Sequence, residues 1–463
     1  MAVGDAQDLV QLARHRVRYA GDAAVLERLY PGTFPRPFSH GDGIYLVDDQ
    51  GHRFVDAGNH LGAAVIGHSR GEMADAIAEQ VRTLEFSALQ PGASHPYAVA
   101  LAERLAKLVP VDDPVFSFTS SGSEANEAAF KTARAYHRRL GNSRKYKIFS
   151  RRSSYHGSSY GAVSATGLSA FRDPFLPLVD GFVFLPHPFP GFCGHCSWDT
   201  AGGCSGSCID ETVAIIEREG PDTVAAIIAE PVSIAGAGVK IPPPTYWQTL
   251  RSLCDEYGIL LIADEVITGF GRTGTMFGCD HWSIRPDMLT FAKGITSGYI
   301  PMGGVAVARH VQDAFGDSAF MHINTYAGHP VACAAAMKTL DIIEREDLIS
   351  RSAAQGPVIA EAFEEIAASV SLPARASVIG AIGSVEFFLS EGTDAGVFAA
   401  RLWHECYERG VLLRVAPVGQ NVSLFFYPPL SIEAGELAEA LARVAEAAIH
   451  ADAELDVKPI PAS

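Results

Sequence analysis

The sequence predicts an α/β fold built around a mainly parallel sheet. Seven short runs rich in Val, Ile, Leu and Phe recur through the middle of the chain, and stretches of helical pattern separate them. The runs are nearly continuous rather than alternating between apolar and polar, which is typical of strands covered on both faces. We expect the strands of a seven-stranded sheet at residues 115–120, 146–150, 181–186, 224–230, 259–265, 288–292 and 303–308.

Helical patterns and a change of composition predict the domain organisation. Helices are expected at residues 124–139, 244–257 and 329–345. The last part of the chain differs from the middle, because it combines long Ala/Glu-rich stretches with a few strands, as in a small α+β domain. We expect an N-terminal segment (1–70) packed with the small domain, a large domain that holds the site (71–340) and the small C-terminal domain itself (341–463).

Composition excludes several classes of protein. The chain has 463 residues, with 36 Lys and Arg against 53 Asp and Glu, for a net charge of −17. This acidic balance disfavours binding of nucleic acid, whose phosphates require a basic surface. No apolar run approaches the roughly 20 residues that span a bilayer, and no secretory signal is evident. Together with eight scattered cysteines, these features predict a cytoplasmic protein with reduced thiols and no membrane association.

Two charged residues each follow an apolar strand. Asp264 ends the run that begins at Ile259, and Lys293 follows the run 288–292. Buried charges are rare without partners, so an acid and an amine at the ends of two core strands indicate one shared site. Pyridoxal 5′-phosphate (PLP) requires both, since its aldehyde forms an imine with a lysine and its ring nitrogen pairs with an aspartate.

Other polar residues fall at the same predicted edge, where ligands bind in open α/β sheets. Ser121 and Glu124 form an S-x-x-E capping box; it marks either a capped helix alone or, with Gly122, a phosphate site at a helix N-terminus. Tyr155 is either a surface residue or a platform for a flat ring. Glu230 either stabilises its loop or belongs to the site.

Two further motifs point elsewhere. The segment GFGRTG at 269–274 matches the dinucleotide pattern G-x-G-x-x-G, but no helical period follows it, so we reject a nicotinamide site. Cys193, Cys196, Cys204 and Cys208 could form a zinc site. Their gaps fit no familiar zinc module, and we expect free thiols and no metal.

Taken together, the motifs SSGSEANEAAFKTAR, YHG, AEP, LLIADEVITGFGRTG, FAKGITSGYIPMGG and INTYAGHPVACAAA resemble the class III (omega) aminotransferases, PLP enzymes of fold type I. The resemblance runs from about residue 40 to the C-terminus. The amine or omega-amino-acid:pyruvate transaminases are the most similar subgroup.

The resemblance implies a role for each matching residue. Lys293 forms the imine with PLP and Asp264 pairs with the pyridine nitrogen. The remaining cofactor contacts are Ser121, Gly122 and Ser123 at the phosphate, Tyr155 and Val266 on the two ring faces, His156 and Glu230 beside the ring, and Thr325 at the phosphate of a neighbouring subunit. That last contact implies a homodimer with active sites at the interface. Arg414 matches an arginine that binds a substrate carboxylate.

Three departures from the family pattern concern the substrate. The segment after Glu230 lacks the glutamate that pairs with this arginine in the ornithine and 4-aminobutyrate subgroup. Gly62 stands where many amine transaminases carry a tryptophan, and Asn324 replaces a common aromatic residue. We therefore expect Gly62, Tyr155, Asn324 and Arg414 to line a wide, polar substrate pocket.

The expected function is a PLP-dependent transaminase that moves an amino group from a primary amine or omega-amino compound to a 2-oxo acid such as pyruvate. Its two half-reactions predict ping-pong kinetics. Two alternatives stay open: an aminomutase or epimerase on the same fold, and a binding protein that has lost catalysis.

Overall fold

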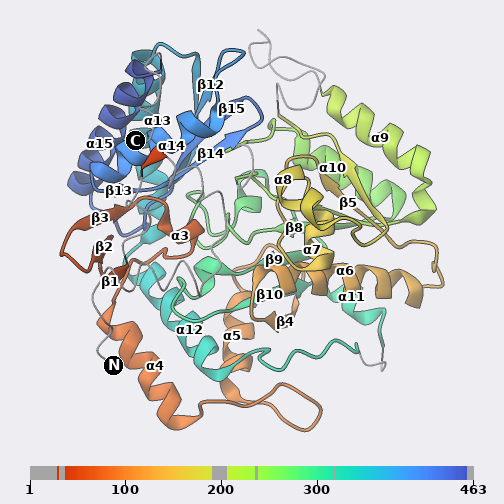
Figure 1. The fold of residues 1–463 in the computed structure, drawn as a ribbon. Helices are drawn as coiled ribbons and strands as arrows, with labels where there is room; N and C mark the ends of the chain where they lie inside the picture. The colour runs from red at the N-terminus through yellow and green to blue at the C-terminus, as the bar shows by residue number, and fades with distance from the viewer. Residues whose placement is uncertain (1–28, 31–36, 190–205, 235–237, 317–319, 456–463) are drawn as a thin grey trace. The chain divides into compact units, whose positions relative to one another are not determined.

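The computed structural model describes residues 29–30, 37–189, 206–234, 238–316 and 320–455 (Figure 1). The chain divides into two compact units. A small unit combines Met1–Gly71 with Ala354–Ser463, and a large unit comprises Glu72–Ala353. Among the described residues, no helix is both long and apolar enough to cross a bilayer.

A seven-stranded sheet forms the centre of the large unit, in the order β4-β10-β9-β8-β7-β5-β6. Strand β10 pairs antiparallel with both of its neighbours, while the other pairings are parallel. The mainly parallel sheet expected from the sequence is confirmed. Its strands are β4 (Val115–Thr119), β5 (Lys147–Arg151), β6 (Phe182–Leu185), β7 (Val224–Ala229), β8 (Leu260–Asp264), β9 (Met288–Phe291) and β10 (Gly303–Val307).

Helices cover both faces of this sheet (Figure 1). From α4 to α12, the α-helices of the large unit are α4 (Gly71–Thr83), α5 (Pro96–Ala106), α6 (Gly122–Arg139), α7 (Tyr160–Ala165), α8 (Ser169–Arg172), α9 (Ser207–Glu219), α10 (Tyr246–Tyr257), α11 (Arg309–Asp313) and α12 (Pro330–Arg345). Short 3-10 helices are η1 (Asp173–Phe175), η2 (Pro221–Thr223), η3 (Gly278–Trp282) and η4 (Lys293–Ile295).

Successive residues of a buried strand point to opposite faces of the sheet, so each strand contributes to two hydrophobic cores. In β7, Ala226 and Ile228 belong to the cluster with α6, whereas Ile227 and Ala229 belong to the cluster with α9 and α10, as the two-residue period of a strand requires. The α6 cluster contains alanines at 125, 128, 129 and 133. Because alanine is small, this face brings the helix backbone close to the sheet.

The small unit contains two four-stranded sheets. One is antiparallel, in the order β11 (Ala374–Ile379), β12 (Ile382–Phe388), β15 (Asn421–Phe426) and β14 (Arg414–Val418). The other joins β1 (Phe38–Asp42), β2 (Tyr45–Asp48) and β3 (Arg53–Asp56) to β13 (Val411–Leu412). The helices of the small unit are α3 (Asn59–Gly62), most of α13 (Leu348–Ser369), α14 (Ala395–Glu408) and α15 (Ala434–Ala453).

One detail of the organisation was not expected from the sequence. The large unit extends to Ala353, past the boundary expected after residue 340. Helix α12 continues to Arg345, and Arg104 of α5 ties it to the large unit by donating to the main-chain oxygen of Met337 and to Glu344. The N-terminal segment belongs to the small unit, where β3 and β13 pair in parallel.

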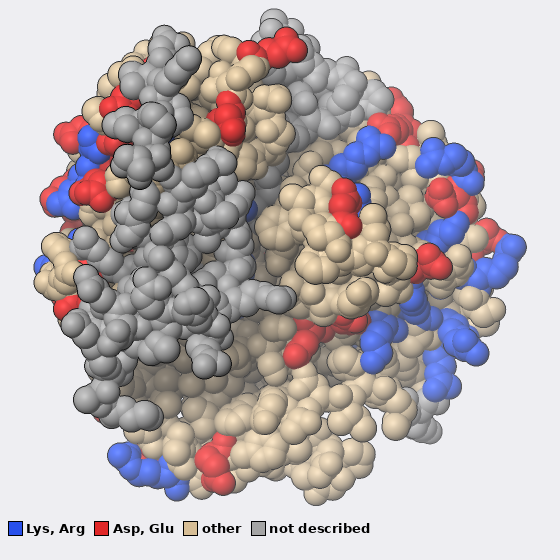
Figure 2. All heavy atoms as spheres, in the orientation of Figure 1, with Lys and Arg blue, Asp and Glu red and all other residues tan. Residues whose placement is uncertain are grey.

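The positions of the charged side chains and of the cysteines do not indicate where the functional site lies. Acidic and basic side chains are scattered over the face shown in Figure 2, with broad areas of other residues between them. Of the four loop cysteines, Cys208 alone lies in the described part of the chain. It is buried in α9. The zinc alternative therefore lies mainly outside the described residues.

Shortening a fully buried side chain of β8 tests the central sheet. Leu261 is fully buried, so Leu261→Ala should lower the free energy of unfolding by about 2–5 kcal/mol, through lost burial and a cavity. Leu140 at the end of α6 is 52% exposed, and Leu140→Ala should change that free energy by less than about 0.5 kcal/mol. Denaturant unfolding followed by circular dichroism measures both. Equal losses would contradict the assigned core.

Candidate active site

One edge of the large sheet gathers the polar residues singled out in the sequence. Ser121, Tyr155, Glu230, Asp264 and Lys293 follow or end strands β4, β5, β7, β8 and β9. Since these strands run in the same direction, their carboxyl ends meet at one edge, the usual ligand position in an open α/β sheet.

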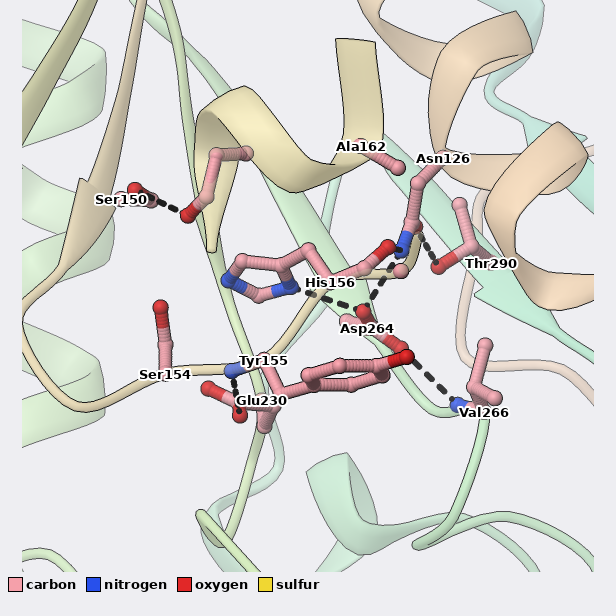
Figure 3. A network of polar contacts seen from close by, with 12 residues as sticks. Asn126, Ser150, Ser154, Tyr155, His156, Ala162, Glu230, Asp264, Val266 and Thr290 are labelled. Carbon is pink, nitrogen blue, oxygen red and sulfur yellow. Dashed lines mark hydrogen bonds and ion pairs between the residues drawn. The ribbon is translucent and has the colours of Figure 1, made fainter. Parts of the chain in front are cut away.

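Asp264 is the centre of a buried hydrogen-bond network (Figure 3). Its side chain is 4% exposed. Oδ2 accepts hydrogen bonds from His156 Nδ1 and Asn126 Nδ2, each at 2.8 Å, and Oδ1 accepts one from the main-chain N–H of Val266 at 3.1 Å. Because a carboxylate only accepts, Nδ1 is the protonated nitrogen of His156 in this contact.

Asn126 is oriented by its other partners. Its Nδ2 also donates to the main-chain oxygen of His156 at 2.7 Å, and its Oδ1 accepts from the hydroxyl of Thr290 at 2.7 Å. If the amide were flipped, its oxygen would face two acceptors, the main-chain oxygen of His156 and Oδ2 of Asp264. Only one orientation of the amide therefore fits the network. Thr290 lies directly opposite Asp264 in the β8–β9 ladder.

The N-terminus of α6 lies beside the same network. Ser121 Oγ accepts from the N–H of Glu124, whose Oε2 accepts from the N–H of Ser120. Among the described residues, the N–H groups of Gly122 and Ser123 have no hydrogen-bond acceptor. A Cβ on Gly122 would lie 2.9 Å from Val266, so only glycine allows this close approach. The expected serine cap is present, but the second half of the capping box is not, because Glu124 accepts from the N–H of Ser120 rather than from that of the N-cap residue Ser121.

Tyr155 and Glu230 also meet. The main-chain N–H of Tyr155 donates to Glu230 Oε1 at 3.1 Å (Figure 3). The tyrosine ring packs edge-to-face against Phe171, with 5.4 Å between ring centroids.

Lys293 follows β9 with an unusual backbone. Its φ is +46°, in the left-handed region that side-chain-bearing residues seldom adopt. The following residues Gly294, Ile295, Thr296 and Ser297 are buried and hold this turn. Such strain is characteristic of functional positions.

Segment 320–327 contains the next two residues singled out in the sequence, Asn324 and Thr325. Asn324 Nδ2 donates to Glu124 Oε2 at 2.7 Å, and its Oδ1 accepts from the N–H of Tyr326. This contact links the segment to the start of α6, which the sequence did not predict. Thr325 is exposed.

Gly62 and Arg414 lie in the small unit. Gly62 ends α3 with φ at +84°, and this left-handed backbone gives a reason for glycine besides pocket width. Arg414 opens β14, with its guanidinium 4.7 Å from the ring centre of Phe425. Their place in a substrate pocket stays a prediction.

Comparison with known proteins identifies the family. The family model of the class III aminotransferases matches residues 31–448. A β-alanine–pyruvate aminotransferase from Pseudomonas aeruginosa is 39% identical over 333 residues, which cover 70% of this chain and 73% of that protein. A putrescine–pyruvate aminotransferase from the same species is 34% identical over 412 residues, covering 87% and 88%.

A solved structure agrees with these relatives. The PLP-bound form of an amine transaminase from an uncultivated Pseudomonas species is 35% identical, with a TM-score of 0.83 over 90% of this chain and 94% of that one. The chain therefore belongs to the class III aminotransferases, the PLP-dependent enzymes of fold type I.

Proposed function

We propose that this transaminase takes an amino group from a primary amine or an omega-amino compound and gives it to pyruvate or a similar 2-oxo acid. PLP is held between Asp264 and Lys293. The two Pseudomonas aeruginosa relatives support the acceptor, because both are named for pyruvate although their amines differ. The observation that carries the residue assignment is the buried, fully oriented carboxylate of Asp264.

This carboxylate fits a protonated ring nitrogen. Among the described residues, Asp264 forms no ion pair with a lysine or an arginine. Oδ1 accepts one hydrogen bond, whereas a carboxylate oxygen can accept two. A cationic N–H in front of Oδ1 would balance a charge that is otherwise expensive to bury.

The start of α6 fits the phosphate of the same group. The N–H groups of Gly122 and Ser123 lack acceptors in the described chain, and the helix dipole adds positive potential there. We assign the phosphate to Ser121, Gly122 and Ser123. The contact between Gly122 and Val266 supports a ring placed next to that phosphate site.

Asp264 and Lys293 have separate roles in the proposed chemistry. PLP, when bound, supplies a ring that accepts the electron pair released as the substrate's C–H bond breaks. Asp264 as an anion keeps the ring nitrogen protonated. Lys293 would hold the cofactor covalently, and its Nζ would be the base that takes the proton from the substrate carbon.

The remaining assignments concern the walls of the site. Tyr155 and Val266 would hold the two faces of the ring, and His156 and Glu230 would lie beside it. Arg414 binds the carboxylate of the 2-oxo acid through its paired N–H groups. Gly62 and Asn324 leave room on the amine side, which favours a long or polar donor.

Assembly and location complete the proposal. We assign a homodimer in which Thr325 reaches the partner's phosphate site. Thr325 is exposed in a segment whose Met321, Ile323 and Tyr326 are 76%, 81% and 61% exposed, as expected for a surface that another chain covers. In the described residues, Cys254, Cys279, Cys333 and Cys406 are free, buried thiols, which supports a reducing, cytoplasmic location.

Replacing the proposed attachment lysine tests the function directly. In the wild-type protein, sodium borohydride should fix PLP on the peptide that contains Lys293, as seen by mass spectrometry. Lys293→Ala should abolish this added mass and lower transaminase turnover by about 100-fold or more, because the proton-transfer group is lost. Lys338→Ala, at a partly exposed position in α12, is the control and should retain both properties. Attachment or turnover that survives in Lys293→Ala would contradict the assignment.

A valine at Thr290 tests the network behind Asp264. Thr290→Val removes the hydroxyl that orients Asn126. A lost hydrogen bond between buried groups is worth about 1–3 kcal/mol, so we expect kcat/KM to fall about 5- to 150-fold.

The matched control is Thr132→Val on α6. Its hydroxyl is also buried but donates only to Ala128 of its own helix at 2.8 Å. Steady-state kinetics with pyruvate should show little change for this variant. The account fails if both valine variants behave alike.

A further inference from the structure

Arg151 is a buried cation outside the residues assigned so far. It ends β5, four positions before Tyr155, and its side chain is 1% exposed. Arginine is almost never fully buried unless it is paired. Its position beneath the sheet edge therefore calls for a specific partner.

That partner is Glu230, which accepts two hydrogen bonds from Arg151. Nη2 of Arg151 donates to the main-chain oxygen of Glu230 at 2.5 Å and to its Oε2 at 2.9 Å. Ser233 Oγ lies 3.1 Å from the same Nη2 and donates to the same Oε2 at 3.1 Å. The guanidinium thus fixes both the main chain and the carboxylate of Glu230.

The second oxygen of Glu230 holds Tyr155. Oε1 accepts the main-chain N–H of Tyr155 at 3.1 Å (Figure 3). Glu230 is 8% exposed, so water cannot readily replace either partner. A continuous path of contacts therefore runs from Arg151 through Glu230 to the residue expected to cover the cofactor ring.

Neighbouring groups leave Glu230 as the anion that balances Arg151. Tyr246 of α10 contacts Arg151, and burial raises its pKa to about 12, so its hydroxyl is neutral. Burial, together with the charges of Arg151 and Lys240, holds the pKa of His187 well below its usual value. Among the described residues, Glu230 is the one carboxylate in an ion pair with Arg151.

We propose that Arg151 is a positioning residue of the transaminase site, which fixes the carboxylate of Glu230 and through it the main chain of Tyr155 beside PLP. This inference rests on the proposed function, which places Glu230 and Tyr155 against the cofactor. Arg151 itself touches neither substrate nor cofactor in this assignment. Removing it would leave a buried carboxylate without its cation, which is strongly unfavourable.

The adjacent arginine offers a matched control. Arg152 has a side chain that is 54% exposed and pairs with Glu211 at 3.3 Å. Arg151→Met and Arg152→Met make the same chemical change one residue apart. Fluorescence quenching gives the dissociation constant of PLP from each apoprotein, and thermal unfolding of each apoprotein reports stability separately.

For Arg151→Met we expect the PLP dissociation constant to rise about 10- to 100-fold, the range seen when residues that orient the ligands of a bound group are removed. The pH titration of the bound cofactor's visible absorbance should shift as well. Arg151→Lys keeps the charge and should recover part of the affinity. Arg152→Met should match the wild type in both measurements.

A double-mutant cycle tests whether Arg151 acts through Glu230. If it does, adding Arg151→Met to Glu230→Gln should weaken PLP binding by less than about threefold beyond Glu230→Gln alone, because coupled residues are not additive. A full, additive loss would overturn the path through Glu230.

Other outcomes separate this inference from the proposed function. If Arg151→Met binds PLP as Arg152→Met does, the inference is wrong whatever its thermal stability. If Arg151→Met does not fold, Arg151→Lys and Ser233→Ala replace it, and PLP affinity equal to the control in both would overturn the inference. A wild-type protein without PLP binding would overturn the proposed function and this inference together.

Discussion

The buried carboxylate of Asp264 constrains the rest of the site. A carboxylate that is 4% exposed is stable only if donors replace the water it has lost. His156, Asn126 and the N–H of Val266 provide those donors, and they come from three separate segments of the large unit. The position of each segment is therefore tied to one charge at the end of β8.

Close packing of α6 makes this arrangement possible. The helix presents alanines to the sheet, and Gly122 approaches Val266 so closely that a Cβ would clash. Gly122 and Asn126 are four residues apart and so share one helix face. The same close approach therefore places the N–H groups at the start of α6 next to the site. It also places the side-chain amide of Asn126, one turn later, against Asp264. A bulkier face on α6 would separate the proposed phosphate site from the proposed ring-nitrogen site.

Strand positions and the two charged strand ends could be predicted from the sequence, because buried strands have continuous apolar runs and isolated charges interrupt them. Asn126, Thr290 and Arg151 were missed. Thr290 is a polar residue within a buried strand, and Asn126 lies on the apolar face of α6; these are signals that a search for polar residues at core positions would find. The partners of Arg151 could not be predicted, since Glu230 and Ser233 are about 80 residues away in sequence. The end of the large unit at Ala353 could not be predicted either, since Ser352 donates to the main-chain oxygen of Arg272, which is 80 residues away in sequence.

The most direct test of the central claim is the protonation state of the cofactor's ring nitrogen. PLP labelled with ¹⁵N in the pyridine ring can be bound to the wild-type protein and to Asp264→Asn and observed by NMR. The account predicts the chemical shift of a protonated pyridine nitrogen in the wild type and a large displacement toward the unprotonated value in Asp264→Asn, which has no negative charge to hold the proton. An unprotonated nitrogen in the wild type, or the same shift in both proteins, would contradict the role of Asp264 on which the account depends.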